Sequence, residues 1–416
     1  MRLRTRLGAG VAGALNGVSR RLGLGRGTVL GGRAGMAIAP GALAELAAGR
    51  LVALVSGTNG KTTTTALLAA ALEVGGRRVV TNSTGSNMPA GHFAALAQGA
   101  GGTPVVLEVD EGYLPGSVET LEPKVVVLLN LSRDQLDRSN EVRMVAGRWR
   151  RALAGSRATV VANADDPLVV YGAELAGSLL WVAGGARWRA DAAGCPACGG
   201  RIEYSVDSWS CRCGFTRPRP EVSAVEEAGT TTAVFADGRR LPVTLAIPGA
   251  FNRRNALMAM AAAGALGVPA EVALAAMGRI EGVAGRFSLR RVQGVLTRVL
   301  LAKNPAGWEE LLDVVAPGTG PVVVAINARI ADGRDPSWLW DVPFERLAGR
   351  PVVATGERSA DVSVRLHYAG VEHQRVGDPA QAVVLAGRLG AAGADGEAVE
   401  FIGNYTAFHD LLRVGA

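Results

Sequence analysis

Val55-Ser-Gly-Thr-Asn-Gly-Lys-Thr-Thr-Thr64 is the most informative segment of this 416-residue chain. It follows the apolar run Leu51–Val55, which predicts a buried strand, and it precedes Thr65–Leu72, which consists mostly of good helix formers. A strand, a glycine-rich turn and a helix place backbone N–H groups and a helix N-terminus around one anion. Lys61 would then reach the terminal phosphates of a nucleotide, and the Thr62 hydroxyl would bind Mg²⁺. The segment therefore predicts a phosphate-binding loop.

The residues around this loop predict a doubly wound α/β fold. Short β-rich runs alternate with helical stretches up to about residue 170, and three further strands are predicted at 78–80, 105–107 and 125–129. Ligands of such sheets bind outside the carboxyl ends of the strands. Glu108 and Asp110 follow the strand that ends at Leu107, so we expect both carboxylates to face the nucleotide. The alternative for Glu108 is a solvated loop carboxylate.

All four cysteines of the chain lie in one short stretch with the spacing C-x2-C-x12-C-x-C. Two knuckles with turn-forming proline and glycine predict a zinc ribbon, inserted at about residues 190–216. Four thiolates would make the zinc site closed and structural. Disulfides are the alternative, but no export signal indicates an oxidising compartment. The predicted ligands are Cys195, Cys198, Cys211 and Cys213.

Bulk properties exclude several classes of protein. A hydrophobic content of 48% with interspersed charge excludes global disorder, and no apolar run approaches the ~20 residues of a membrane-spanning helix. The formal charge of +7 suits nucleic acid, anionic lipid head groups or a pyrophosphate substrate. No acid precedes Glu45, and a basic N-terminal helix is predicted rather than a cleaved targeting peptide. This segment carries Arg2, Arg4, Arg6, Arg20, Arg21 and Arg26.

Several strings together resemble the Mur ligase superfamily, whose members join an amine to a carboxylate with ATP. They stand in the family's order at 57–63, 130–137, 163–167, 249–255 and 285–286. The resemblance implies that ATP is bound by Gly57, Thr58, Asn59, Gly60, Lys61, Thr62 and Thr63. It also implies that Glu108 and Thr62 bind Mg²⁺, that Asn252 recognises adenine and that Arg286 offsets phosphate charge. The alternative for Asn252 is a helix N-cap, which asparagine favours.

The chain departs from the amino-acid-adding members of that superfamily in two ways. Many of them carry a carbamoylated lysine in the central domain, but this chain has no lysine between Lys124 and Lys303, and Gln135 replaces the family's histidine. Beyond residue 290, Leu301–Gly307 takes the place of the family's usual C-terminal motif, and a second unusual string follows at Asp332–Asp341. Together with the four cysteines, they resemble the synthetase subunits of the lipid II isoglutaminyl synthases.

This closer resemblance implies that the α-carboxylate of D-glutamate in the lipid II stem peptide is amidated through an acyl phosphate. Ammonia would come from a glutaminase partner subunit of the GatD type. Asp335 would complete a Cys–His pair of that partner into a triad, with Asp332 and Asp341 as lesser candidates. The alternative for Asp335 is a carboxylate that satisfies its own turn. The flanking Trp338 and Trp340 suit an interface, since aromatic residues are enriched there.

Three regions are expected: a basic N-terminal segment (1–46), a Mur ligase-type central domain (47–290) and an α/β, Rossmann-like C-terminal domain (291–416). The expected location is cytoplasmic, at the inner face of the plasma membrane, where lipid II is found. An amino-acid-adding Mur or folylpolyglutamate-type ligase is the alternative function. A nucleic-acid-stimulated NTPase is disfavoured because the ribbon lacks interleaved aromatic and basic residues, so we expect no nucleic-acid partner.

Overall fold

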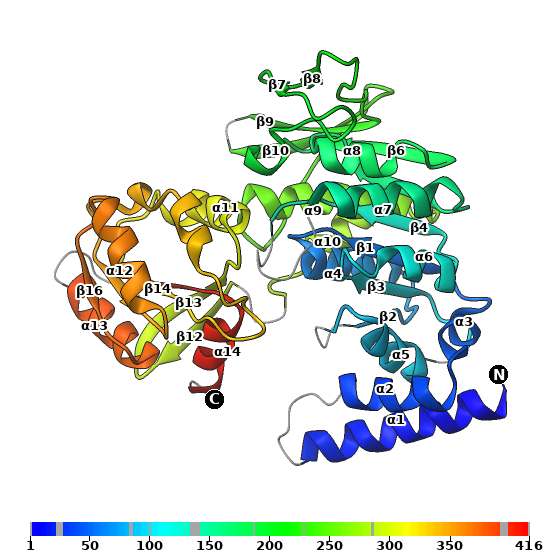
Figure 1. Cartoon of the computed structure of the whole chain (residues 1–416), viewed down its shortest axis with the longest axis horizontal. Coiled ribbons are helices and arrows are strands. Elements are labelled where there is room, and N and C mark those ends of the chain that lie inside the picture. The colour runs from blue at the N-terminus through cyan, green and yellow to red at the C-terminus, as the bar shows by residue number, and fades with distance from the viewer. Residues whose placement is uncertain are drawn as a thin grey trace. The chain divides into compact units, whose positions relative to one another are not determined.

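The computed structural model describes residues 2–21, 28–82, 86–99, 101–133, 142–185, 188–227, 229–283, 287–391 and 398–414 (Figure 1). The chain forms two compact units. The first contains the described residues within 1–132, 141–246 and 250–281, and the second contains those within 133–140, 247–249 and 282–416.

A nine-stranded sheet forms the centre of the first unit, with strand order β11-β10-β9-β6-β5-β4-β1-β3-β2. The strands from β6 to β2 in this order are parallel, whereas β9, β10 and β11 pair antiparallel to one another. Strand β1 lies between β3 and β4, so the chain winds outward from it in both directions. The strands are β1 (Val52–Ser56), β2 (Val80–Thr81), β3 (Val105–Val109), β4 (Val125–Leu128), β5 (Thr159–Asn163), β6 (Ser178–Ala183), β9 (Val222–Glu227), β10 (Thr230–Phe235) and β11 (Arg240–Pro242).

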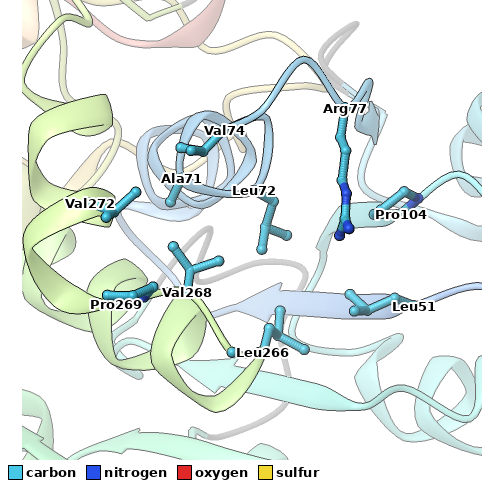
Figure 2. Close-up of a pocket in the computed structure, with 11 residues that line it drawn as sticks. Leu51, Ala71, Leu72, Val74, Arg77, Pro104, Leu266, Val268, Pro269 and Val272 are labelled. Atoms are coloured by element: carbon cyan, nitrogen blue, oxygen red, sulfur yellow. The ribbon is translucent and has the colours of Figure 1, made fainter.

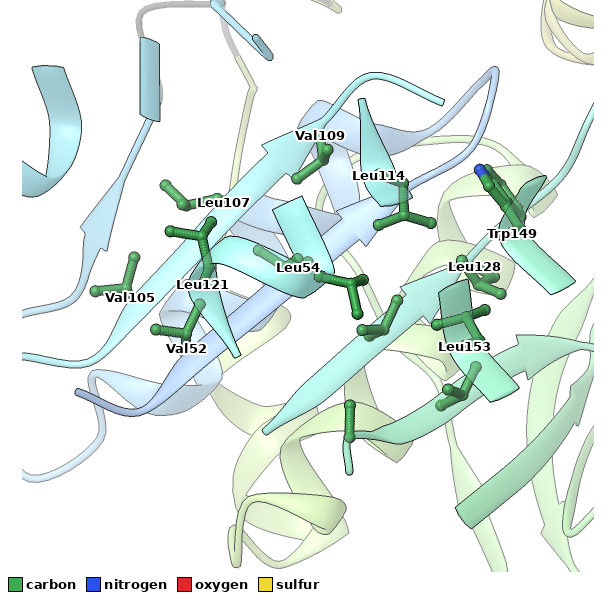
Figure 3. Packing of buried hydrophobic residues seen from close by; sticks show 14 of the residues in the cluster. Val52, Leu54, Val105, Leu107, Val109, Leu114, Leu121, Leu128, Trp149 and Leu153 are labelled. Atoms are coloured by element: carbon green, nitrogen blue, oxygen red, sulfur yellow. The ribbon is translucent and has the colours of Figure 1, made fainter. Parts of the chain in front are cut away.

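Helices cover both faces of this sheet. Strand residues alternate between the two faces, so Leu54 and Leu107 pack on one side while Ala53 and Val55 pack on the other. Figure 3 shows the first side, where β1, β3 and β4 pack against Leu114 and Trp149. That side is covered by α6 (Leu114–Leu121), α7 (Val142–Ala154) and α8 (Pro167–Ala173), and the other by α4 (Lys61–Leu72), α9 (Ala250–Ala265) and α10 (Ala270–Met277).

Four further helices precede or flank the edge strand β2. In Figure 1, α1 lies at one end of this unit, α2 packs on it, and α5 lies between α2 and β2. They are α1 (Leu3–Arg21), α2 (Thr28–Ile38), α3 (Ala42–Ala47) and α5 (Pro89–Gln98). The predicted strand at 78–80 is mostly wrong, because β2 begins only at Val80. Strand β2 pairs with β3 alone at the sheet edge, and the exposed Arg78 before it has no ladder partner.

The second unit is a six-stranded sheet with helices, in the order β12-β13-β17-β14-β15-β16. Only the edge strand β12 is antiparallel to its neighbour. Its strands are β12 (Ser288–Val292), β13 (Val295–Leu301), β14 (Val322–Ala325), β15 (Val352–Thr355), β16 (His373–Arg375) and β17 (Val399–Gly403). Its helices are α11 (Pro305–Val315), α12 (Ser359–Tyr368), α13 (Pro379–Ala391) and α14 (Tyr405–Val414).

Candidate functional site

The glycine-rich loop connects β1 to α4 and requires glycine at two positions. Gly57 has φ 142°, and a Cβ atom there would lie 2.9 Å from the Leu129 side chain and 3.0 Å from the Asn130 backbone nitrogen. Gly60 has φ 86°, and its Cβ would lie 2.6 Å from Asn255 Oδ1. Positive φ and close contact both exclude larger residues. The loop leads directly into α4, which begins at Lys61, so the structure has the predicted order of strand, glycine-rich turn and helix.

Lys61 is buried at the start of α4, with 6% of its surface exposed. Its ammonium group donates hydrogen bonds to the carbonyl oxygens of Gly57 (2.5 Å) and Thr58 (3.2 Å). It also forms an ion pair with Glu111, with 3.0 Å between Nζ and Oε2. The indole N–H of Trp149 donates to the Glu111 carbonyl oxygen at 2.9 Å and so helps to position this residue. The Lys61 side chain is thus folded back onto the glycine-rich loop that precedes it.

Thr62 and Glu108, the two residues expected to bind Mg²⁺, lie side by side. The Thr62 hydroxyl donates to Glu108 Oε2 at 2.8 Å. Glu108 is 8% exposed, so it is not a solvated loop carboxylate. Its backbone is fixed by Asn82, whose amide both accepts from the Glu108 N–H and donates to the Glu108 carbonyl, each at 2.8 Å. Nε2 of the buried His92 contacts the same carbonyl oxygen at 3.0 Å.

The segment after β4 fixes the other side of the loop. Asn130 Oδ1 accepts from the Asn59 backbone N–H at 2.9 Å, and its amide donates to the Asn59 carbonyl at 3.0 Å. The Thr58 hydroxyl accepts from the Ser132 N–H at 3.0 Å and donates to the Ser132 carbonyl at 3.2 Å. Thr58 and Asn59 therefore hold the loop in place through contacts more than seventy residues along the chain.

The structure describes three of the four remaining residues that were predicted to bind or face the nucleotide. Thr63 is buried in the first turn of α4. Asn252 is the third residue of α9 and is fully buried, so it is not a helix N-cap. Asp110 accepts from the Gly112 N–H at 3.0 Å within its own turn. Arg286, like Gln135, lies outside the described residues.

The turn at 163–167 links three parts of the first unit. Asp166 caps α8 by accepting from Leu168 N, and its second oxygen accepts from Leu131 N at 2.8 Å. Its burial raises the pKa of this carboxyl to about 6, against the lowering effect of the backbone donors. Asp165 accepts from Gly184 N at 2.8 Å and pairs with Arg217 at 2.8 Å. These contacts join β4, β6 and the segment that leaves the cysteine ribbon.

The four cysteine sulfurs converge, with all Sγ atoms within 4.8 Å of one another. Their ribbon consists of the hairpin β7 (Ile202–Tyr204) and β8 (Trp209–Cys211) and the turns around it. Gly199 (φ 80°) and Gly214 (φ 92°) each follow the second cysteine of a knuckle, where a left-handed backbone is needed. The Gly200 N–H lowers the pKa of the Cys198 thiol to about 7, whereas burial raises that of Cys195 to about 12. The donor set and spacing fit a tetrahedral zinc ion.

In the second unit, polar side chains meet at the carboxyl ends of β14, β15 and β17. Asn327 and Asn404 form a reciprocal pair, since Asn404 Oδ1 accepts from the Asn327 N–H (3.1 Å) and its amide donates to the Asn327 carbonyl (2.7 Å). The buried Asp332 accepts from the Thr406 N–H at 2.9 Å and from its hydroxyl. Burial raises the pKa of the Asp332 carboxyl. These bonds fix the start of the loop that carries Asp335.

Asp335 is exposed and accepts from the backbone N–H (2.9 Å) and hydroxyl (3.0 Å) of Ser337. Asp341 is paired with Arg133 at 3.2 Å. Of the two expected aromatic anchors, only Trp340 is exposed, at 55%. Trp338 is buried, so its prediction as a surface residue is wrong.

Two comparisons identify the family of the chain. Residues 55–182 match the Mur ligase middle domain model. The UDP-N-acetylmuramoylalanine–D-glutamate ligase of Bordetella pertussis Tohama I is 31% identical over 368 residues, which cover 85% of this chain and 69% of that protein. The chain belongs to the Mur ligase family. A pseudomurein peptide ligase type C from Methanothermus fervidus has the same fold, with a TM-score of 0.67, 21% identity and coverage of 88% of this chain and 78% of that one.

A second family model matches the C-terminal part of this Mur ligase. Residues 301–408 match the MurT ligase C-terminal model. Subunit MurT of the lipid II isoglutaminyl synthase (glutamine-hydrolyzing) of Streptococcus pneumoniae R6 is 29% identical over 409 residues. The match covers 90% of this chain and 89% of that subunit. The resemblance to MurT subunits inferred from the sequence is thereby confirmed.

A cavity of about 180 Å³ in the first unit lies away from the phosphate-binding loop. Figure 2 shows that it is lined by apolar side chains, including Leu72 and Val268, with Arg77 at one side. Leu72 ends α4, whereas the loop precedes the start of that helix, so the cavity lies at the opposite end of α4 from Lys61. It therefore does not serve as the phosphate site of this Mur ligase.

Sequence reasoning missed Glu111 as the ionic partner of Lys61. It also missed the cap role of Asn304, whose side chain accepts from Gly307 N at 2.9 Å and begins α11. The pattern Asn-Pro-x-Gly was a usable signal for the second, because asparagine followed by proline favours a helix start. No local signal marks Glu111, since its partner is fifty residues away.

Proposed function

We propose that this Mur ligase amidates the α-carboxylate of D-glutamate in the lipid II stem peptide, forming D-isoglutamine with ATP and ammonia. It acts as the synthetase subunit of a two-subunit amidotransferase in peptidoglycan synthesis. The match of residues 301–408 to the MurT ligase C-terminal model carries the proposal, because this is the part in which the chain departs from amino-acid-adding relatives. The lack of any lysine between Lys124 and Lys303 supports the same distinction.

The phosphate-binding loop suits ATP. Gly57 and Gly60 allow the loop to pack closely against Leu129, Asn130 and Asn255, and the N-terminus of α4 follows it with Lys61 at its first position. When the γ-phosphate binds, the Lys61 ammonium exchanges a carbonyl partner for a phosphate oxygen and offsets the repulsion between phosphate and substrate carboxylate. Glu111 keeps the ammonium near the loop. Asn252 is proposed for adenine recognition and Arg286 for charge compensation.

The pair Thr62 and Glu108 suits Mg²⁺, because a hydroxyl and a carboxylate oxygen 2.8 Å apart can bind one hard cation together. When bound, Mg²⁺ would neutralise phosphate charge. The reaction then proceeds in two displacements. A substrate carboxylate oxygen attacks the γ-phosphorus and ADP leaves. Ammonia attacks the resulting acyl phosphate at carbon, loses a proton, and inorganic phosphate leaves with that oxygen.

Ammonia is proposed to come from glutamine through a glutaminase subunit of the GatD type. Asp335 is the residue proposed to orient the partner's histidine, because it is exposed while Asp332 is buried and bound to Thr406. A carboxylate in that position holds the imidazole in one tautomer and stabilises its charged form. The exposed Trp340 offers an aromatic contact nearby in the sequence.

Zn²⁺ is proposed to be bound by the four cysteines in a structural role.

The described part of the chain contains no helix that is long and apolar enough to cross a membrane. We place the protein in the cytoplasm, peripherally at the membrane where lipid II is found.

The test is an assay of product identity. The purified chain, together with its glutaminase partner, is incubated with lipid II, ATP, Mg²⁺ and either glutamine, ammonium or free amino acids. Mass spectrometry of the stem peptide should show exchange of a hydroxyl for an amino group with the first two nitrogen sources. Addition of a whole amino acid would instead establish the alternative ligase function.

A further inference from the structure

Helix α1 differs from an ordinary surface helix, because its apolar face is exposed and its face of small and polar residues is buried. Its large apolar side chains face the solvent, with exposed fractions between 39% and 74%. They recur at intervals of three or four residues and so form one stripe along the helix. The stripe consists of Leu3, Leu7, Val11, Leu15 and Val18.

The buried face of α1 is made of small and polar residues instead. Ala12 and Asn16 pack closely on α2, where a Cβ on Gly31 would lie 2.6 Å from the Ala12 carbonyl and 2.2 Å from Asn16 Oδ1. Gly8 likewise meets Gly35 of α2, with 2.8 Å between its would-be Cβ and the Gly35 carbonyl oxygen. Such close contacts through small residues join helices without apolar side chains between them. The apolar side chains of α1 are thus left for another surface.

The charges next to this stripe have one sign. Arg2, Arg4 and Arg6 are exposed at the start of α1, and Arg33 is exposed on α2. No acid precedes Glu45, and this carboxylate is already bound by the Arg2 backbone N–H and by the Thr5 hydroxyl (2.5 Å). Apolar residues flanked by arginines fit a bilayer surface that contains anionic lipids. Among the described residues, no helix is suited to span a membrane.

We propose that the exposed stripe of α1 docks the protein onto an anionic lipid bilayer, with the helix in the plane of the head groups. Lipid binding follows from α1 itself. The benefit for catalysis, which is that the site meets a lipid-linked substrate, rests on the proposed function.

The test is sedimentation of the full chain with vesicles of phosphatidylglycerol and phosphatidylcholine, and with vesicles of phosphatidylcholine alone. The wild type should bind the mixed vesicles more tightly. Leu7→Ser/Leu15→Ser should weaken that binding by roughly tenfold or more. Arg4→Gln/Arg6→Gln should weaken it on the mixed vesicles only, by roughly fivefold per arginine at low salt. The matched control Val206→Ser/Leu175→Ser changes exposed apolar residues elsewhere in the same unit and should bind like the wild type.

Three results would overturn the proposal. They are an absence of vesicle binding by the wild type, unchanged binding by Leu7→Ser/Leu15→Ser, and a wild-type dimer that this double change dissociates, because a second copy would then cover the stripe. Amidation separates this proposal from the proposed function. The leucine variant should lose activity on lipid II in vesicles but retain it on a water-soluble substrate with the same head group. Activity on neither substrate, even in the wild type, would refute the amidation while leaving the lipid binding intact.

Discussion

Lys61 and Glu111 show how single residues are arranged at the proposed phosphate site. The lysine is buried, yet it is held at the loop by an ion pair and two carbonyl oxygens rather than by apolar packing. Its removal therefore takes away a charge at the proposed phosphate site and little of the core.

We expect Lys61→Ala to abolish ATP turnover and amidation, a loss of at least ~10²-fold, because one positioned charge in such a site contributes roughly 3 kcal/mol or more to the transition state. Lys124→Ala is the matched control, since Lys124 is exposed. Phosphate release and thermal unfolding are to be measured for both. Wild-type turnover in a folded Lys61→Ala protein would refute the assignment of the loop.

His92 makes the stability of the first unit depend on pH. Burial lowers the pKa of its imidazole. Below the ordinary value of about 6.5, the unfolded chain therefore takes up a proton that the folded chain does not, and the free energy of unfolding falls as the pH falls. The slope is at most ~1.4 kcal/mol per pH unit for one proton. His92→Gln should flatten this dependence in denaturant titrations, while the exposed His367→Gln should not; equal slopes in all three proteins would contradict the account.

At the level of elements, the cysteine ribbon has only a small core of its own. Cys195, Ile202 and Trp209 form a cluster with Val170 of α8, and the Trp209 indole donates to the Ala164 carbonyl at 3.0 Å. A hairpin of two three-residue strands with so few buried residues is marginally stable by itself, and a bound metal would supply the additional constraint.

Elemental analysis should find one zinc per chain, and Cys198→Ser should remove it and lower the Tm by several degrees. Cys198 is exposed, so without a metal its substitution by serine would cost within about 0.5 kcal/mol. Ser210→Ala, at an exposed position of the same hairpin, is the control. Zinc-free protein with a wild-type Tm would show that the four thiols serve another purpose.

At the scale of the whole molecule, the features that could be predicted from the sequence are those that depend on short local patterns. The glycine-rich loop, the buried strands around it and the cysteine knuckles are short patterns with fixed spacing, and the structure contains all three. The pairing of Lys61 with Glu111 and of Asn59 with Asn130 could not be predicted, because it depends on how distant strands meet. The burial of Trp338 was missed for the same reason.

If a glutaminase partner supplies the ammonia, a substitution that affects the partner's site should lower amidation with glutamine but not amidation with added ammonium. Asp335→Asn should cripple glutamine-dependent amidation by the complex, because the partner's histidine would lose its orienting carboxylate. Activity with added ammonium should remain, since the synthetase site is untouched. Glu372→Gln, which changes an exposed carboxylate elsewhere in the second unit, is the control. Equal loss with both nitrogen sources would assign Asp335 to folding or to the ATP site.

Transfer of isotopes tests the central claim, that a D-glutamate α-carboxylate is activated by ATP and captured by ammonia. Lipid II labelled with ¹⁸O in that carboxylate is incubated with the protein, ATP, Mg²⁺ and ¹⁵N-ammonium, and the products are analysed by mass spectrometry. The account predicts ¹⁵N and one ¹⁸O in the new carboxamide, and the other ¹⁸O in inorganic phosphate. Unlabelled phosphate, or a stem peptide without ¹⁵N, would contradict it.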